Sequence, residues 1–471
     1  MSIAVPSPRV LQRAHVTNIG GAGMSAVAAL LLARDSIVSG SDANDTPAMA
    51  VLRSKGARTT VGYDPGIVDD LDATTVIVRS TATRDDNPQL VRARERGLTI
   101  LHRSEALAAL MADRRQVAVA GTHGKSTTTS MIAIALSECG LDPSYAIGAD
   151  LAGPGTNARA GAGAVFVVEA DESDGSFLRT APEVAIVTNI EPDHLDYWGS
   201  EQALNTAFLD YARGVVTGGT LVACLDDQGA RSLAEQGAVA GLSVKTYGST
   251  VGADLELTAI ELDASGSRFV PVMGGRSLGE FSLQVPGGHN VANAGAALLA
   301  GLLIGAPVEG LRAGLASFTG ARRRFDRKGV VAGVTVVDDY AHHPTEVAAN
   351  VAAARSVAGA GRVLAVFQPH LYSRTAALAT QFGEALAAAD EVVVLDIYGA
   401  RELPVAGVSG QLIADAVATA NGRVHYAPAR EQVVALIASL VRKGDLVLMM
   451  GAGDISELAQ PLLDAIGVSA S

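Results

Sequence analysis

A glycine-rich segment with one lysine and several hydroxyl side chains is the clearest chemical signal in the sequence. Its residues are Gly121, Thr122, His123, Gly124, Lys125, Ser126 and Thr127. The segment follows an apolar run and opens a Thr-rich stretch that is typical of a helix start. Between a strand and a helix, backbone N–H groups and the helix dipole converge on an anion. Lys125 can neutralise phosphate charge, and a hydroxyl of Ser126 or Thr127 can ligate Mg²⁺, so the segment predicts a nucleoside triphosphate site.

Acidic and histidine side chains follow two later apolar runs. Glu169 comes directly after residues 164–168, and His194 stands shortly after residues 184–188. Such runs predict buried strands of a parallel sheet, whose carboxyl ends share the edge where ligands bind. The sequence therefore predicts a divalent-metal site beside the phosphate loop. Mg²⁺ prefers oxygen ligands, so a histidine in this set is unusual.

Two polar clusters lie in the last third of the chain. The first covers residues 338–346 and the second residues 367–374, and each begins at the end of an apolar run. An isolated histidine is more often structural than catalytic. Two histidine-containing clusters at neighbouring strand ends favour a functional site, since ligands bind at that edge of a parallel sheet.

A second glycine-rich turn occurs near the start of the chain, at Gly20, Gly21, Ala22 and Gly23, with Asp42 further on. The pattern resembles a dinucleotide-binding fingerprint, but a complete one needs glycine at position 18 or 26, and these are Asn18 and Ala26. The amides of the turn can bind a pyrophosphate without any nicotinamide. A purely structural turn is the plainer alternative.

The elements that would position these groups form three alternating series of strands and helices, which predicts an α/β fold with three domains. Residues 1–112 predict an N-terminal Rossmann-like domain. Residues 113–325 predict a central domain with a parallel sheet like that of P-loop ATPases and an antiparallel annex at residues 244–285. Residues 326–471 predict a second Rossmann-like, doubly wound domain. A length of 471 residues agrees with about three domains.

Composition excludes several classes of function. The 36 Lys and Arg against 49 Asp and Glu give a net charge of -13, which argues against a nucleic-acid-binding protein. The longest apolar stretch, residues 294–306, is shorter than the roughly 18 to 20 residues that span a bilayer, so we expect no membrane insertion. Cys139 and Cys224 cannot form a disulfide framework, which predicts a reducing, cytoplasmic location.

Six motifs in one order give the chain a resemblance to the Mur ligase family along nearly its whole length. They read GTHGKSTTT, VVEADESDGSFL, NIEPDHLDYW, GGHNVANAGAA, DDYAHHPTE and FQPHLYSR. The phosphate loop is shared by the whole family. The stretches GGAGMS, AHHPTE and QPH-x-YSR are similar to the alanine-adding branch, and the tripeptide-recycling branch is the nearest competitor.

The resemblance implies a role for individual residues. Those implied to bind ATP are Gly121 to Thr127, with Lys125 at the phosphates, then His289, Asn290 and Asn293 near adenine, Arg324 near the γ-phosphate and Asp339 near the ribose. Those implied to ligate Mg²⁺ are Ser126, Glu169 and His194. The Gly20 to Gly23 turn, Ser80 and Arg103 are implied for the UDP-sugar, and Tyr340, His342 and Arg374 for the amino acid and the acyl phosphate. The implied catalytic set is Lys125, His342, Arg374 and Arg324.

The sequence leaves the roles of two neighbouring histidines and two departures from the family pattern open. His342 and His343 are not distinguished by the sequence. Asn18 and Leu371 stand where many members of the family have Gly and Arg, so one pyrophosphate contact and one positive charge are expected to differ.

The resemblance also implies a reaction. In it, ATP and Mg²⁺ drive the joining of L-alanine to the carboxylate of UDP-N-acetylmuramate through an acyl phosphate. This step belongs to cytoplasmic peptidoglycan precursor synthesis, and so to cell wall biogenesis, cell shape and cell division. The alternatives are a tripeptide-recycling ligase, a nicotinamide-dependent oxidoreductase built on the N-terminal turn, and a non-catalytic nucleotide-binding regulator. Selectivity against glycine and serine, feedback control and the choice between monomer and weak dimer are left open.

Overall fold

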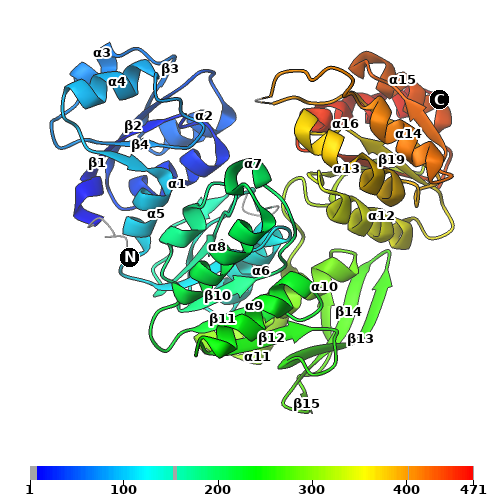
Figure 1. Ribbon diagram of the computed structural model, residues 1–471, viewed down its shortest axis with the longest axis horizontal. Coiled ribbons are helices and arrows are strands. Elements are labelled where there is room, and N and C mark those ends of the chain that lie inside the picture. The colour runs from blue at the N-terminus through cyan, green and yellow to red at the C-terminus, as the bar shows by residue number, and fades with distance from the viewer. Residues whose placement is uncertain (1–7, 152–155, 401, 470–471) are drawn as a thin grey trace. The chain divides into compact units, whose positions relative to one another are not determined.

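The computed structural model describes residues 8–151, 156–400 and 402–469. The chain divides into two compact units. The first contains Met1–Thr258, Pro271–Gly279 and Ala292–Leu315, and the second contains Ala259–Val270, Glu280–Val291 and Ala316–Ser471. Three sheets run through these units in chain order (Figure 1).

The N-terminal sheet is parallel and has the strand order β3-β2-β1-β4-β5, which matches the first five strands of the Rossmann order 3-2-1-4-5-6. Its strands are β1 Arg13–Thr17, β2 Ile37–Asp42, β3 Arg58–Val61, β4 Val76–Arg79 and β5 Ile100–His102. The helices are η1 Pro8–Gln12, α1 Ala22–Leu32, α2 Pro47–Ser54, α3 Gly66–Asp69, α4 Pro88–Glu95 and α5 Arg103–Met111. Thr46 and Asn87 cap α2 and α4, each followed by proline in the first turn, so local sequence sets where these helices begin. The predicted Rossmann-like domain is confirmed.

The central sheet has eleven strands, ordered β15-β14-β13-β12-β11-β10-β6-β9-β7-β8, with β16 paired to β14. The strands are β6 Arg115–Ala120, β7 Ser144–Ala146, β8 Ala158–Arg159, β9 Val165–Glu169, β10 Val184–Val187, β11 Thr220–Cys224, β12 Val244–Gly248, β13 Leu255–Asp263, β14 Gly266–Met273, β15 Arg276–Ser277 and β16 Phe281–Leu283. The helices are α6 Lys125–Glu138, η2 Ser176–Arg179, α7 Leu195–Trp198, α8 Glu201–Arg213, α9 Gln228–Val239, α10 Gly288–Ile304 and α11 Val308–Ser317. Strand β6 lies between β9 and β10, and all three are parallel, so their carboxyl ends share one edge.

The antiparallel annex is present but begins later than the sequence predicts. Strand β14 pairs antiparallel with β15 and β16. By contrast, β12 is parallel to β11, and β13 starts parallel to β12. The expectation that the annex starts at residue 244 is therefore wrong. Short strands separated by glycine have similar sequences in parallel and antiparallel sheets, which is why the sequence does not reveal the boundary.

The C-terminal sheet has the order β17-β18-β22-β19-β20-β21. Its strands are β17 Asp326–Val331, β18 Val334–Asp339, β19 Val363–Phe367, β20 Glu391–Val394, β21 Val424–Tyr426 and β22 Leu446–Met450. The helices are α12 Pro344–Ala358, α13 Tyr372–Leu386, α14 Gln411–Thr419, α15 Arg430–Leu440, η3 Ile455–Leu458 and α16 Ala459–Ser469. Only β17 in this sheet is antiparallel to its neighbour, among the residues described. The sequence places the first strand of the domain at β18 and misses β17, whose largely exposed residues lack an apolar run.

Helices cover both faces of the C-terminal sheet (Figure 1). One buried cluster joins the sheet to α12, α13 and α14, and includes Val347, Phe382 and Ile413. The other joins it to α15 and α16, through residues such as Val433 and Leu462. Two apolar layers on one parallel sheet define the doubly wound arrangement, and this part of the fold prediction is confirmed.

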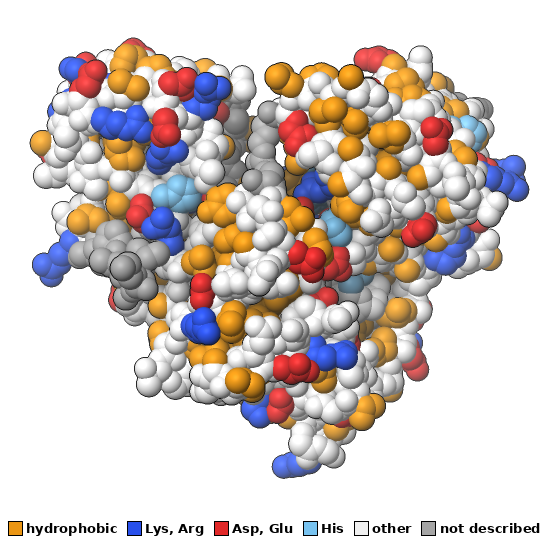
Figure 2. Space-filling model, viewed as in Figure 1, with side chains coloured by type: hydrophobic (Ala, Val, Ile, Leu, Met, Phe, Trp, Pro, Cys, Tyr) orange, Lys and Arg blue, Asp and Glu red, His pale blue; other side chains and the backbone are white. Residues whose placement is uncertain are grey.

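The surface carries charges of both signs, and the two cysteines are free thiols. No helix in the described ranges has the length and the apolar character needed to cross a membrane. Acidic and basic side chains are interspersed on the face shown in Figure 2. Cys139 is half-buried, Cys224 is buried, and both are free thiols.

The close packing of α13 against α14 generates a stability prediction. A Cβ added at Gly383 would lie 2.5 Å from the Cβ of Ala416, and its other near neighbours are backbone atoms of the same residue. We expect Gly383→Ala to lower the free energy of unfolding by about 1–3 kcal/mol, because the overlap outweighs the gain in helix propensity. Urea unfolding followed by circular dichroism measures this.

Gly467 in α16 is the matched control. Its nearest neighbour would be a side-chain methyl group of Val331 at 3.3 Å, which can move. Gly467→Ala should leave the stability unchanged or raise it by up to about 1 kcal/mol. Equal effects of the two substitutions would contradict the packing argument.

Candidate active site

The phosphate loop between β6 and α6 requires its two glycines. Gly121 has φ of 131° and Gly124 has φ of 82°, both in the region that side chains disfavour. A Cβ at Gly121 would overlap the hydroxyl of Thr188, and one at Gly124 would lie 2.6 Å from Asn293 Oδ1. The loop is also tied to the end of β10, because the His123 amide donates to Asn189 Oδ1 at 2.7 Å. These protein contacts fix the course of the loop.

Lys125 is enclosed by this loop and by a buried acid. Its Nζ donates to the carbonyl oxygens of Gly121 at 2.6 Å and Thr122 at 3.1 Å, and to Glu172 Oε1 at 2.8 Å. Burial lowers the pKa of Lys125, but attraction from Glu172 and Asp171 outweighs it, so the net shift is upward. Burial raises the pKa of Glu172 to about 7, and Lys125 opposes that rise. Lys125 thus keeps its charge in the loop, with Glu172 as its resting partner.

The predicted metal ligands lie at the same sheet edge. Ser126 Oγ donates to Glu169 Oε1 at 3.1 Å, and the Gly148 amide donates to Glu169 Oε2 at 2.6 Å. A hydroxyl and a carboxylate in contact suit a hard cation such as Mg²⁺. His194 is the N-cap residue before α7 and has φ of 53°, and its Nε2 lies 4.0 Å from Glu172 Oε1. The oxygen donors therefore fit the predicted ion, while His194 lies beside the partner of Lys125.

Asn293 is brought directly to the phosphate loop. Its Oδ1 accepts a hydrogen bond from Thr128 Oγ1 at 3.1 Å and lies over Gly124. His289 and Asn290 lie at the start of α10, where Asn290 Nδ2 donates to Pro286 O at 2.7 Å. Burial lowers the pKa of His289 to about 4, although Glu346 opposes the shift, so this imidazole is neutral at physiological pH.

The N-terminal glycine turn connects β1 to α1. The Gly20 amide donates to Asp42 Oδ2 at 2.9 Å, so Asp42 holds the turn. The guanidinium of Arg103 lies against Gly23 so closely that a Cβ there would overlap it. Arg103 Nη2 is also 3.9 Å from Asp171 Oδ2. The predicted UDP-sugar residues Gly20, Gly23 and Arg103 are therefore brought together.

Asn18 has a backbone conformation that glycine adopts readily. Its φ is 56°, a left-handed value that asparagine tolerates better than most residues. Its side chain accepts a hydrogen bond from the Tyr63 hydroxyl and donates to Thr83 Oγ1 at 3.2 Å. Ser80 Oγ lies 3.4 Å from the same Thr83 hydroxyl. Asn18 thus places a polar side chain beside the turn, in contact with Tyr63 and Thr83.

Asp339, predicted to lie near the ribose, accepts three hydrogen bonds from the protein. Its Oδ2 accepts from the Phe325 amide at 2.6 Å, and its Oδ1 accepts from the Ala341 amide at 2.7 Å and Asn350 Nδ2 at 2.8 Å. Burial raises the pKa of Asp339 to about 6, with Arg324 and these amides opposing the rise. The carboxyl group joins the segment before β17 to the loop after β18.

The structure distinguishes His342 from His343. His343 is buried and caps α12, where it forms a capping box with Glu346. The ring of His342 instead lies 5.2 Å from that of Tyr340 and 6.0 Å from that of His370, in edge-to-face contact. Of the two, His342 is the one placed among the other predicted amino-acid site residues.

Arg374 extends the cluster formed by Tyr340, His342 and His370. Arg374 is buried, with Nη1 3.5 Å from His370 Nδ1. The ring of His370 stacks on Tyr398 at 6.0 Å. Leu371 is buried with φ of 71°, a strained value for a branched side chain. Sequence reasoning did not single out Tyr398, which lies in a loop with no motif.

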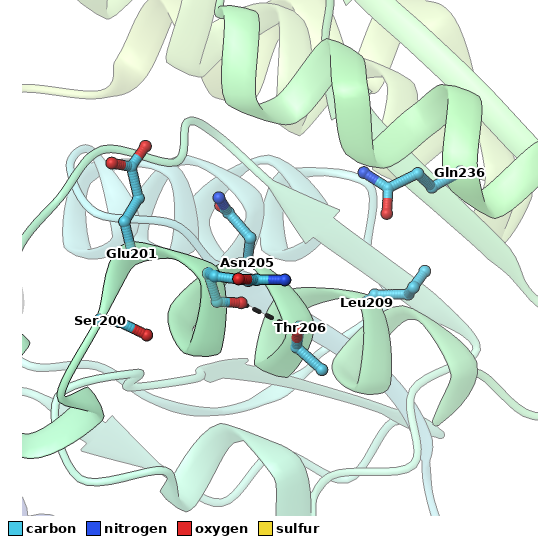
Figure 3. A pocket seen from close by; sticks show the side chains of 7 residues that line it. Ser200, Glu201, Asn205, Thr206, Leu209 and Gln236 are labelled. Carbon is cyan, nitrogen blue, oxygen red and sulfur yellow. Dashed lines mark hydrogen bonds between the residues drawn. The ribbon is translucent and has the colours of Figure 1, made fainter.

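A hollow opens on the surface of the first unit (Figure 3). It has a volume of about 560 Å³ and is lined by polar side chains of α8, among them Glu201, Asn205 and Thr206, and by Gln236 of α9. Thr206 Oγ1 donates to Gln202 O at 2.8 Å, a bond internal to α8. No residue predicted from the sequence to act in a site lines this hollow.

Comparison with known proteins identifies the family. The description "Mur ligase family, catalytic domain" matches residues 13–115, "Mur ligase middle domain" matches residues 119–301, and "Mur ligase, glutamate ligase domain" matches residues 323–453. The chain belongs to the Mur ligase family.

Particular relatives share one name. The chain is 54% identical over 458 residues to the UDP-N-acetylmuramate--L-alanine ligase of Saccharopolyspora erythraea, covering 96% of this chain and 93% of that one. It is 53% identical over 464 residues to the protein of the same name from Kineococcus radiotolerans, covering 98% of each chain. The crystal structure of UDP-N-acetylmuramate-alanine ligase from Thermotoga maritima matches with a TM-score of 0.79 and 27% identity, covering 97% of this chain and 99% of that one.

The single tryptophan of the sequence offers a test of the loop. Trp198 Nε1 donates to the carbonyl oxygen of Glu172 at 3.1 Å, and the Glu172 side chain holds Lys125. If Lys125 exchanged Glu172 for phosphate oxygens, the charge distribution near the indole would change. We expect MgATP to change the tryptophan emission in a saturable way, which a fluorescence titration measures.

Lys125→Ala is the control for this titration, because it removes the group that changes partner. Its emission should stay constant on adding MgATP. Unchanged emission of the unsubstituted protein, in a sample where equilibrium dialysis shows ATP bound, would contradict the proposed exchange.

Proposed function

We propose that this protein is an ATP-dependent ligase that joins L-alanine to the carboxylate of UDP-N-acetylmuramate, in peptidoglycan precursor synthesis in the cytoplasm. The observation that carries the proposal is identity of 54% and 53%, over nearly the whole chain, to two ligases with this name. Such a reaction needs phosphoryl transfer from ATP and attack by the amine of alanine. The loop around Lys125 would serve the first, and the polar cluster around His342 would serve the second. The proposal therefore rests on both sequence and geometry.

We also propose a division of labour among three domains, with boundaries at residues 112/113 and 325/326. The three family matches, which begin at residues 13, 119 and 323, support boundaries close to these. The N-terminal domain would bind the UDP-sugar through the Gly20 to Gly23 turn, Ser80 and Arg103. The central domain would bind ATP, and the C-terminal domain would bring L-alanine.

ATP binding has an electrostatic requirement. The sugar carboxylate and the triphosphate repel each other, by about 4 kcal/mol per unit pair of charges at 4 Å and an effective dielectric constant near 20. Lys125 and Arg324 supply fixed positive charge, with Asn293 over the loop and His289 and Asn290 at the start of the same helix. Asp339 would act from the ribose side, which requires it to share a carboxyl group that already accepts three hydrogen bonds.

Magnesium would be held by Ser126 and Glu169, with His194 nearby. Bound there, Mg²⁺ supplies charge neutralisation for phosphoryl transfer. The contact between Ser126 and Glu169 is the feature of this chain that fits the ion. The Ser126 hydroxyl donates to the Glu169 carboxylate at 3.1 Å, so the two proposed ligands are adjacent.

The reaction would proceed in two steps. The sugar carboxylate attacks the γ-phosphorus and ADP leaves, giving an acyl phosphate. The amine of L-alanine then attacks the acyl carbon, inorganic phosphate leaves, and the amine gives up a proton. His342 is our candidate for orienting or deprotonating the amine, since its Nδ1 lies 3.3 Å from Glu346 Oε2 and 3.0 Å from Tyr340 O. Arg374 and Tyr340 would hold the amino acid and the acyl phosphate.

One assay tests the proposed function most directly. Purified protein with MgATP and UDP-N-acetylmuramate should release ADP when L-alanine is added, faster than with glycine or L-serine, and should not respond to the recycled tripeptide. Lys125→Ala should lower this rate by about a thousandfold or more, because it removes the charge facing the phosphates. Its affinity for UDP-N-acetylmuramate by calorimetry should stay within about twofold, because the glycine turn is a separate site.

The outcomes of this assay separate the alternatives. ADP release with the tripeptide and not with alanine would indicate the recycling ligase. Binding of ATP with no release of ADP under any of these conditions would indicate the non-catalytic nucleotide-binding regulator. Loss of UDP-sugar binding in Lys125→Ala would contradict the division between domains.

Isotope transfer tests the intermediate. With ¹⁸O in the carboxylate of UDP-N-acetylmuramate, one labelled oxygen should appear in inorganic phosphate, because the acyl phosphate breaks at the acyl carbon. Mass spectrometry of the phosphate measures this. Label that stayed entirely in the amide product would exclude the acyl phosphate.

A further inference from the structure

Arg323 lies next to a predicted catalytic residue but was given no role by the sequence. It precedes Arg324 and has φ of 57°. The Tyr340 amide donates to its carbonyl oxygen at 2.8 Å, so its backbone is fixed to the loop after β18. The side chain is half-buried and makes three contacts within the second unit, with the turn after β22, with Asp338 in β18 and with Tyr340 just after that strand.

The first contact is with the glycine turn after β22. Arg323 Nη2 donates to the carbonyl oxygens of Gly451 at 2.6 Å and Gly453 at 3.2 Å. Gly451 has φ of 155°, and a Cβ on Gly453 would lie 2.6 Å from the ring of Tyr398. From the sequence this turn is equally suited to holding a ligand or to ending the strand. The structure shows its carbonyl groups directed at Arg323.

The second contact is with a buried carboxylate. Asp338 has 0% exposure, and within the described ranges neither of its oxygens makes a hydrogen bond. Arg323 Nε and Lys328 Nζ each lie 3.6 Å from Asp338 Oδ2. Burial raises the pKa of Asp338, and the two cations oppose the rise. A buried charge is costly without a partner, so Asp338 and Arg323 hold each other in place.

The third contact is with an aromatic ring of the proposed amino-acid site. The guanidinium carbon of Arg323 lies 5.0 Å from the ring centre of Tyr340, and that of Arg324 lies 5.1 Å from it. Both distances are within the range of a cation–π contact. The same ring is in edge-to-face contact with His342 at 5.2 Å. Arg324, Tyr340 and His342 are therefore linked through one ring, and Arg323 is fixed against it.

We propose that Arg323 is a positioning residue, which fixes Tyr340 and Arg324 for the ligase reaction by joining them to Asp338 and to the turn at Gly451 and Gly453. This inference rests on the proposed function, because it concerns the residues assigned there. Arg323 acts through its neighbours and need not touch a substrate. A planar guanidinium can donate to the two glycine carbonyl groups, place Nε toward the Asp338 carboxylate and lay its flat face on the Tyr340 ring at the same time. The ammonium group of lysine cannot do all three, so lysine cannot replace Arg323.

The test compares Arg323→Lys with Arg322→Lys, a matched change at the exposed neighbouring arginine. Steady-state kinetics would use MgATP, UDP-N-acetylmuramate and L-alanine. For Arg323→Lys we expect kcat to fall about thirtyfold and KM for alanine to rise about fivefold, with KM for the UDP-sugar within twofold. Arg322→Lys should match the unsubstituted protein.

Two further variants keep the test decisive if Arg323→Lys folds poorly. Asp338→Asn removes the carboxylate charge that holds Arg323, and should change the same two constants in the same direction. Arg323→Ala should regain part of its kcat when guanidinium chloride is added at millimolar concentration, while Lys125→Ala should not.

The outcomes have distinct meanings. A fall in kcat with all three KM values unchanged and no guanidinium rescue would mean that Arg323 only supports the fold, which overturns the inference. Kinetics of Arg323→Lys equal to those of Arg322→Lys would also overturn it. In both cases a normal rate for the unsubstituted protein leaves the proposed function standing, whereas absence of alanine-dependent ADP release in that protein refutes the function itself.

Discussion

The enclosure of one lysine ammonium by a glycine loop and a buried carboxylate is the interaction on which the active centre depends. Lys125 cannot stay charged at the carboxyl edge of an apolar sheet unless acceptors surround it, and the loop carbonyls and Glu172 provide them. The same acceptors hold the side chain where phosphate oxygens would arrive. Phosphate oxygens that took the place of Glu172 would keep a negative partner beside the lysine.

Local signals predict much of the fold. Apolar runs followed by glycine turns identify most of the parallel strands, because a strand buried on both faces has few other possible sequences. The parallel order around β6 then explains why groups far apart in sequence, such as Ser126 and Glu169, meet. Strand β17 was missed because an exposed edge strand needs no apolar pattern.

Features that depend on the exact register of distant segments could not be predicted. His342 and His343 are adjacent and chemically identical, and only the start of α12 decides which one caps the helix. Glu172 sits in an acidic run in which any member could pair with Lys125. Asp338 and Arg323 meet because β17 folds back along β18, a pairing that the sequence does not reveal.

The two glycine turns show how the same backbone geometry can serve different chemistry. At the N-terminal turn, Asp42 already accepts from the Gly20 amide, so an anion there meets fewer free donors and one fixed negative charge. The compensating cation is Arg103, packed on Gly23 and delivered from α5 rather than from the turn itself. At the central loop the cation belongs to the loop, through Lys125. A charge carried by a separate helix can anchor a diphosphate, whereas phosphoryl transfer needs the cation to stay aligned with the loop amides as charge develops. This difference, rather than the glycine pattern, is the reason for proposing that the chemical step takes place in the central domain.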